Sequence, residues 1–259
     1  MRDVSGQRQV ADIPGMRVLR YFVLGATGRT GSQFVSQCLA RGHHVTAFIR
    51  NPTRLPESIR SHPAMTIHSG ELLDVSAIAS ALSSARHDVL VCMLASENPP
   101  FVAVSTGTQS LLCALESLGE AQRVPFFSVG SWGMGASQAH ITGFLLRAVV
   151  SIAKSTFWAK PYADFERQFA DIERAEQRAL IRPTILLPPM LTQGPKSATY
   201  AYGEPDAMRY RMHAASSISR ASLADLCVRL SERATEEVTP RWVAIVETSR
   251  NRLKFGAPV

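Results

Sequence analysis

The stretch that most constrains the fold is residues 21–32, which read YFVLGATGRTGS. A short apolar run there breaks into three glycines, Gly25, Gly28 and Gly31. Strand, glycine turn and helix start follow in the order that a dinucleotide pyrophosphate needs, because glycines permit a tight turn and close approach of the backbone. A helix over Thr30–Leu39 would then point its first amides at the phosphates. We therefore expect a nucleotide site here.

The residues after the second expected strand indicate which dinucleotide is preferred. His44–Ile49 alternates and is rich in β-branched residues, and an NAD-preferring site would place Asp or Glu after it for the ribose 2′-hydroxyl. This chain has Arg50 there, Arg54 one turn further, and Arg29 within the glycine loop. Because a guanidinium binds phosphate oxygens bidentately, the pattern favours NADP(H) over NAD(H). The alternative is that these arginines are ordinary solvated surface charges.

Strand and helix patterns alternate along the chain. Strands are expected near residues 17–24, 44–49, 64–68, 88–94, 123–128 and 181–187, with helices between them. This alternation predicts an α/β fold of the Rossmann type, a doubly wound parallel sheet with the cofactor across the carboxyl ends of its strands. A further helix is expected over residues 218–230, capped by Ser219 or Ser222, and one edge strand at residues 242–246.

Length and composition predict one domain. The 259 residues and 46% hydrophobic content suit a flexible N-terminal extension (residues 1–15) followed by a single NAD(P)-binding domain (residues 16–259). No long apolar window or apolar leader is present, so we expect a cytoplasmic protein without a membrane partner. The formal charge of +7 is dispersed, which favours a small-molecule substrate over nucleic acid. The sequence leaves open whether the protein forms a homodimer.

Cysteines and histidines do not form a metal-binding pattern. The four cysteines (Cys38, Cys92, Cys113 and Cys227) lie within expected helices or strands and have no CxxC spacing, so buried structural thiols are the default. The adjacent pair His43-His44 lies in an expected turn between helix and strand, where neighbouring side chains point apart. We expect no metal site.

Several motifs carry a family resemblance: GATGRTG, FIRNPTRL, Gly70-Glu71 followed by Asp74, the strand Val89–Leu94, and Leu187–Thr192 with its two prolines. From about Arg17 to about Glu232 the chain resembles the NmrA-like, atypical branch of the short-chain dehydrogenase/reductases, near the flavin reductase (biliverdin IXβ reductase) group. The resemblance implies NADPH/NADP+ as the cofactor. Glu71 stands where the family usually has Asp. With the residue patterns above, the expected cofactor-binding residues are Gly25, Thr27, Gly28, Arg29, Thr30, Gly31, Arg50, Arg54, Glu71, Leu94 and Ala95.

The usual catalytic pair of that superfamily is missing. A typical member donates a proton from a tyrosine whose pKa is lowered by a lysine four residues later. Here Tyr162 is followed at that spacing by Glu166, and a carboxylate would raise the pKa of the phenol. The resemblance places a substrate-facing serine after the fifth strand, where Ser131 beside Trp132 is preferred to Ser128.

Two segments are expected to cover the substrate, at about residues 132–162 and 189–217. Most of the first, residues 139–158, reads equally well as an extra amphipathic helix on the core. The second is rich in tyrosine, as a binding loop would be. The candidate catalytic residues are Ser131, Tyr162 and Asp164, and the candidate pocket residues are Trp132, His140, Pro189 and Met190.

Three functions are compatible with these patterns. The first is an NADPH-dependent reductase that transfers hydride directly to a small organic acceptor, as the resembled group does. The second is a non-redox enzyme of the cyclase or isomerase type, using acid and base residues such as Asp164, Glu166, His140 or Lys160. Asp164 and Glu166 can also be the charged face of a surface helix. The third is a catalytically silent NADP-sensing regulator, and fold alone does not separate the three.

Overall fold

The computed structural model describes residues 17–95, 99–119, 123–140, 148, 150–152, 155–156, 158–197, 200–206, 216–235 and 237–247. The expected extension at residues 1–15 lies outside this range, as do residues 141–147 and 207–215 of the two expected covering segments.

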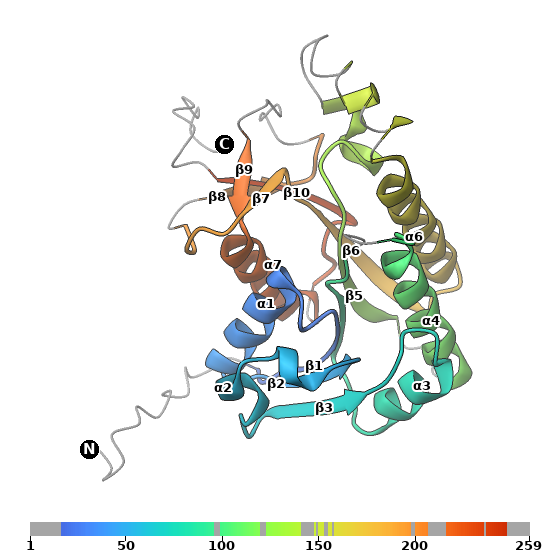
Figure 1. The fold of residues 1–259 in the computed structure, drawn as a ribbon, viewed down its shortest axis with the longest axis vertical. Coiled ribbons are helices and arrows are strands. Elements are labelled where there is room, and N and C mark those ends of the chain that lie inside the picture. The colour runs from blue at the N-terminus through green and yellow to red at the C-terminus, as the bar shows by residue number, and fades with distance from the viewer. Residues whose placement is uncertain are drawn as a thin grey trace, which may run out of the picture.

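All six expected strands form one parallel array. They are β1 (Arg20–Leu24), β2 (His44–Ile49), β3 (Met65–Ser69), β4 (Val89–Cys92), β5 (Val124–Val129) and β6 (Ile181–Leu187). The sheet has eight strands in the order β3-β2-β1-β4-β5-β6-β10-β8, as Figure 1 shows. Strand order reverses between β1 and β4, and this switch point is where a doubly wound sheet binds its ligand. The Rossmann-type fold is confirmed.

Helices cover both faces of the sheet (Figure 1). They are α1 (Arg29–Ala40), α2 (Glu57–Arg60), α3 (Val75–Ser83), α4 (Ala103–Ser117), α6 (Ala159–Gln177) and α7 (Arg220–Ala234), with short 3-10 turns η1 (Pro52–Arg54) and η2 (Gly135–His140). Successive side chains of a strand point to opposite faces. Tyr21 and Val23 therefore join the cluster under α1 and α7, whereas Phe22 and Leu24 join the cluster under α3, α4 and α6.

The last strand corrects one expectation. β10 (Trp242–Glu247) forms where the sequence predicts a strand, but it is not an edge strand. It lies between β6, to which it is parallel, and the antiparallel β8 (Tyr200–Gly203), and its residues from Val243 to Glu247 are buried. The reason is that β8 comes from the segment after β6 and covers the edge, a pairing that the local pattern of β10 does not contain.

The segment between β6 and α7 begins and ends in a second, small sheet. β7 (Met190–Thr192) follows β6 directly and pairs in parallel with β9 (Ser217–Ser219), which leads into α7. The hydroxyl of Ser219 accepts the backbone N–H of Ser222 at 3.0 Å, so the expected N-cap is confirmed. Among the described residues, none of the helices combines the length and the apolar character needed to cross a membrane.

Candidate functional site

The glycine turn is packed so closely that larger residues cannot replace Gly25 or Gly31. Gly25 follows β1 with φ of +83°, and a Cβ there would lie 2.6 Å from the carbonyl carbon of Met93, just beyond β4. A Cβ on Gly31 would lie 2.1 Å from the carbonyl oxygen of Gly25. The start of α1, the turn and the chain after β4 therefore meet at the switch point, and only glycine lets them do so.

The amino end of α1 is prepared for an anion. Gly28 is its N-cap and provides no side chain, and the first turn contains no acidic residue. The backbone N–H of Gly28 donates to Gly25 at 2.9 Å, which closes the turn, and the N–H of Ser32 donates back to Gly28 at 2.9 Å. The first amides of a helix have no partner within the helix and carry its positive dipole end. With Thr27 and Thr30 alongside and partly exposed, this end fits a pyrophosphate.

Arg50 lies at the same edge of the sheet as the glycine turn. Strands β1 and β2 are parallel with Leu24 opposite Phe48, so Arg50 is level with the turn that follows β1. Its side chain is exposed, as is that of Arg29 at the start of α1. The neighbouring residue Asn51 is engaged locally, because its side chain accepts the N–H of Thr53 at 3.0 Å and caps η1. An NAD-preferring site has a carboxylate at this position, which accepts hydrogen bonds from the ribose 2′-hydroxyl. This chain has a guanidinium there.

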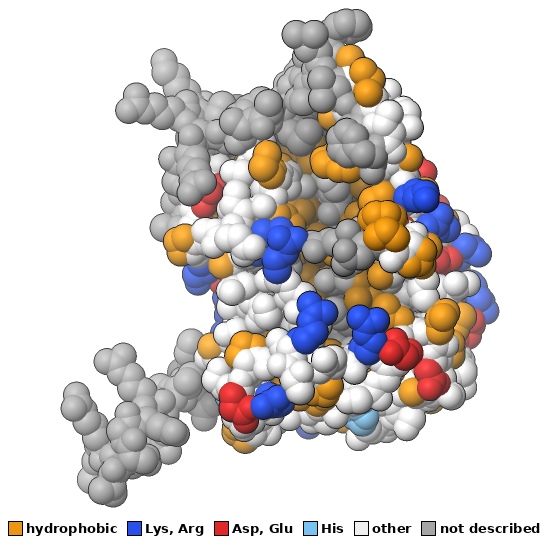
Figure 2. All heavy atoms as spheres, in the orientation of Figure 1, with side chains coloured by type: hydrophobic (Ala, Val, Ile, Leu, Met, Phe, Trp, Pro, Cys, Tyr) orange, Lys and Arg blue, Asp and Glu red, His pale blue; other side chains and the backbone are white. Residues whose placement is uncertain are grey.

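Charge on this face agrees with that placement. Arg54, the last residue of η1, is also exposed. Figure 2 shows several separate Lys and Arg side chains on the face near α1, beside an area of hydrophobic side chains, with Asp or Glu side chains next to some of them. The exposed arginines near the glycine turn favour a ligand with several phosphates.

The other expected cofactor residues lie at the ends of β3 and β4. Glu71 is exposed and follows Gly70, where a Cβ would lie only 2.4 Å from Cζ of Phe48. Leu94 and the exposed Ala95 follow β4, and the amide nitrogen of Leu94 lies 2.8 Å from the position of a Cβ on Gly25. The structure therefore places the residues that follow β3 and those that follow β4 at the carboxyl edge of the sheet, next to the glycine turn.

The two serines near the end of β5 differ in exposure. Ser128 lies inside β5 and is 1% exposed, with no hydrogen-bond partner for its hydroxyl among the described residues. Ser131 is partly exposed, and its hydroxyl makes only a long 3.4 Å contact to the carbonyl of Trp132. The N–H of Trp132 donates to Pro188 at 2.8 Å, which holds this loop against the end of β6.

The other expected pocket residues differ in exposure. Trp132 is buried, as is Pro189, whereas Met190 is 64% exposed at the start of β7. His140 ends η2, and its side chain lies outside the described residues. Trp132 and Pro189 are thus packed into the protein beyond the ends of β5 and β6, and Met190 presents an apolar side chain at the surface.

Asp164 has a structural place that the sequence did not indicate. Its carboxylate is fully buried and accepts the backbone N–H of Val104 at 3.0 Å and of Ser105 at 3.1 Å, together with the Ser105 hydroxyl. It therefore caps the amino end of α4 from α6. The surface-charge interpretation is wrong for Asp164 but holds for Glu166, which is exposed. The capping contacts account for the buried carboxylate, so we do not retain Asp164 among the catalytic candidates.

This assignment predicts a stability effect. Asp164→Ala should lower the free energy of unfolding by about 2–3 kcal/mol, because it removes a buried charged cap with several hydrogen bonds. Glu166→Ala, on the exposed side of the same helix, should change it by less than about 0.5 kcal/mol. Urea unfolding of both variants measures the difference. Equal stabilities would show that the Asp164 cap contributes nothing to the fold.

Tyr162 lies in the first turn of α6 and is partly buried, and its N–H donates to Trp158 at 2.8 Å. The residue one turn on is Glu166. The usual tyrosine–lysine pair is thus missing from this helix, and the role of Tyr162 in proton transfer stays a prediction.

A buried charged cluster escaped the sequence analysis. Asp225 on α7 is 3% exposed and accepts hydrogen bonds from Arg41 at 2.6 Å, Tyr200 at 2.7 Å and Lys196 at 3.2 Å. Burial acts to raise the pKa of Asp225, but the bonds from Tyr200 and Lys196 and the charge of Arg41 lower it below its usual value. The one signal in the sequence was a single carboxylate between Ala224 and Leu226 in an expected helix.

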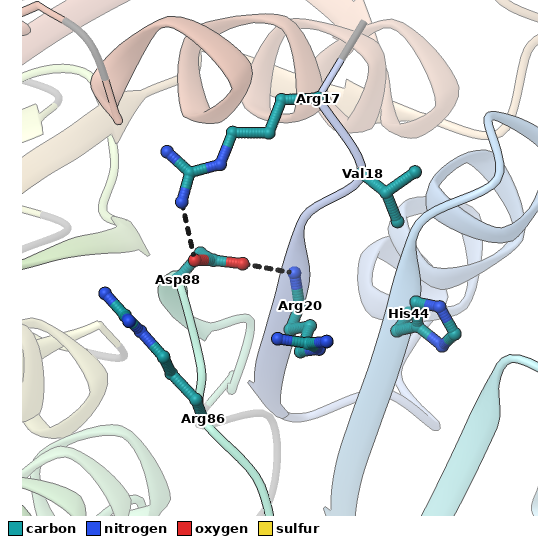
Figure 3. Close-up of a pocket in the computed structure, with 6 residues that line it drawn as sticks. All are labelled: Arg17, Val18, Arg20, His44, Arg86 and Asp88. Atoms are coloured by element: carbon teal, nitrogen blue, oxygen red, sulfur yellow. Dashed lines mark hydrogen bonds and ion pairs between the residues drawn. The ribbon is translucent and has the colours of Figure 1, made fainter. Parts of the chain in front are cut away.

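A separate hollow of about 450 Å³ lies at the opposite edge of the sheet (Figure 3). It is lined at the amino ends of β1, β2 and β4 by Arg17, Val18, Arg20, His44, Arg86 and Asp88. Asp88 binds the guanidinium of Arg17 at 3.1 Å and the backbone N–H of Arg20 at 2.9 Å. Since the glycine turn follows the carboxyl end of β1, this hollow does not belong to the dinucleotide site.

The thiols are mostly, but not all, buried. Cys38, Cys92 and Cys227 are buried as expected, whereas Cys113 is exposed on α4 because it lies on the outer face of that helix. Within the part of the chain that the structure describes, no group of three or more His, Cys, Asp or Glu residues could hold a metal ion.

Comparison with known proteins agrees with this site. A family model described as NAD(P)H-binding matches residues 25–234. A 3-diazoavenalumate denitrifying reductase from a Streptomyces species is 33% identical over 117 residues, covering 41% of this chain and 36% of that protein. A GDP-mannose 4,6-dehydratase from Sordaria araneosa is 31% identical over 113 residues, covering 42% and 20% respectively. The chain thus spans well under half the length of these curated relatives.

Solved structures share the fold. A short-chain dehydrogenase/reductase of the wide type from Veillonella parvula, in complex with NADP, superposes with a TM-score of 0.68 at 14% identity. The match covers 90% of this chain and 96% of that one.

Proposed function

The chain belongs to the NAD(P)H-binding family, and from this premise we propose that it is an NADPH-dependent oxidoreductase that reduces a small organic acceptor. The observation that carries the coenzyme preference is the guanidinium of Arg50 at the end of β2, level with the glycine turn. The reductase activity is also supported by the Streptomyces relative, which is named as a reductase.

Different residues at the carboxyl edge of the sheet would bind different parts of the dinucleotide. The amides at the start of α1 would hold the pyrophosphate, and Arg50, with Arg29 and Arg54 nearby, would hold the 2′-phosphate. Glu71, Leu94 and Ala95, at the ends of β3 and β4, complete the adenosine side of the site. The nicotinamide, when bound, supplies a hydride.

The chemistry then depends on position rather than on a strong acid. Reduction adds one hydride and one proton to the acceptor and leaves NADP+. Without a tyrosine–lysine pair, the proton comes from water or a loosely held side chain. Ser131 would donate a hydrogen bond to the acceptor, and the buried Trp132 beside it would exclude water from that side. Orienting the acceptor and excluding water from the site are sufficient contributions of the protein to a direct hydride transfer.

The test is oxidation of NADPH under anaerobic conditions, followed by absorbance at 340 nm, with flavin and quinone acceptors. We expect turnover that depends on both protein and acceptor, with NADPH preferred to NADH. Tight NADPH binding without oxidation by any acceptor would contradict the reductase proposal and favour a sensor. Turnover of a substrate with the coenzyme unchanged would favour a non-redox enzyme, whose buried acid candidate Asp164 is already engaged in capping α4.

A further inference from the structure

The described part of the second covering segment (residues 189–197, 200–206 and 216–217) is held by the start of α7, and this inference rests on the proposed function. Asp225 on α7 accepts the phenol of Tyr200 at 2.7 Å and the ammonium of Lys196 at 3.2 Å. Both residues belong to the segment that is expected to cover the acceptor. A buried carboxylate with charged and phenolic donors forms strong hydrogen bonds.

Further bonds join the segment to the first turns of α7. The backbone N–H of Ser197 donates to the hydroxyl of Ser222 at 2.8 Å, and Arg220 donates to the carbonyl of Leu191 at 3.3 Å. The segment is therefore fixed to α7 at several points between β7 and β8. Among the described contacts on α7, Asp225 is the only residue that binds two side chains of the segment through one buried carboxylate. Figure 1 shows β7 and β9 beside the start of α7.

The same carboxylate also reaches the helix that carries the glycine turn. Arg41, the C-cap of α1, donates to Asp225 at 2.6 Å and to Glu232 at 3.1 Å. The side chain of Gln37 donates to the carbonyl of Ala221 at 2.9 Å, and a cavity of about 480 Å³ separates α1 from residues 193–196. Asp225 is thus shared by α1, α7 and the segment.

We propose that Asp225 is a positioning residue for the acceptor: through Lys196 and Tyr200 it fixes the segment that covers the substrate side of the dinucleotide site. It touches neither acceptor nor coenzyme and acts through the two side chains. If Asp225 only stabilised the fold, removing any ion pair of similar strength would have a similar effect. A positioning role predicts that the two partners on the segment matter for the acceptor and that a comparable ion pair elsewhere does not.

The chain offers a matched pair for this test. Lys196 and Arg174 each donate to an aspartate, at 3.2 Å to Asp225 and at 2.6 Å to Asp171, and their side chains are 54% and 70% exposed, but both partners of the second pair belong to α6. Tyr200→Phe, Lys196→Met and Asp225→Asn should each raise KM for the acceptor by about tenfold, the effect of losing one hydrogen bond to a buried carboxylate. The Kd for NADPH should change by less than about twofold, and Arg174→Met should change neither constant. An unchanged acceptor KM in Tyr200→Phe and Lys196→Met would overturn the proposal, even if Asp225→Asn does not fold.

A second readout does not depend on the reaction. Hydrogen exchange across residues 190–197 and 200–203, measured without acceptor, should speed up in Tyr200→Phe and Lys196→Met but not in Arg174→Met. If no acceptor is ever reduced, faster exchange in these two variants still supports the role of Asp225 in holding the segment, while the reductase proposal fails. Equal exchange in all three variants and the wild type would overturn the positioning role whatever the activity.

Discussion

Replacing Gly31 with alanine is expected to weaken NADPH binding by about tenfold to a hundredfold and to lower the free energy of unfolding by about 1–3 kcal/mol. The added Cβ would lie 2.1 Å from the carbonyl oxygen of Gly25, which is backbone and cannot rotate away. Relief requires α1 to move away from the turn, which also displaces the amides that hold the pyrophosphate. Fluorescence titration with NADPH and thermal unfolding measure the two effects.

Gly194→Ala is the matched control for this variant. Its nearest neighbour would be the hydroxyl of Thr192, at 3.7 Å from the added Cβ, an ordinary van der Waals contact. We expect its NADPH affinity to equal that of the wild type. Wild-type affinity in Gly31→Ala would contradict the close packing of the turn against α1.

Charge reversal at Arg50 is expected to change the coenzyme preference. In Arg50→Asp the affinity for NADPH should fall by about tenfold to a hundredfold, because a hydrogen bond between charged groups is lost and a repulsion replaces it. NADH should bind as well as before or better, since a carboxylate at this position can accept bonds from the ribose 2′-hydroxyl. Parallel titrations with both coenzymes give the ratio of the two dissociation constants.

Arg86→Asp is the control that separates the loss of a local contact at Arg50 from the effect of a changed net charge. Arg86 is exposed near the opposite edge of the sheet and undergoes the same change of charge. We expect it to leave the NADPH/NADH ratio unchanged. If Arg50→Asp altered both coenzymes equally, Arg50 would not read the 2′-phosphate.

The features that local sequence predicted are those governed by neighbouring residues. The strand, the glycine turn and the start of α1 lie within residues 20–31, so their packing follows from a single run of sequence. Likewise Ser219 caps α7 through an N–H only three residues away, at Ser222. The position of Arg50 relative to the turn then followed from the parallel pairing of β1 and β2, a regular property of this fold.

What the sequence did not predict depends on partners far along the chain. The carboxylate of Asp164 accepts the N–H of Val104, 60 residues earlier, and no local pattern distinguishes it from the exposed Glu166. β10 is interior because β8 pairs with it across the segment that contains α7. Asp225 accepts a hydrogen bond from Arg41, which lies 184 residues earlier in the sequence. Each of these contacts exists only once the sheet has brought distant elements together.

The central claim is that the carboxyl edge around Gly25, Gly31 and Arg50 forms one NADPH site. A native mass spectrum of the wild-type chain after incubation with NADPH tests it most directly. We predict a mass increase of one NADPH for each chain, less occupancy with NADH at the same concentration, and less occupancy with NADPH in Gly31→Ala. A wild-type chain whose mass stays unshifted at high NADPH concentration would contradict the account. So would a Gly31→Ala chain whose occupancy equals that of the wild type at an NADPH concentration near the wild-type Kd.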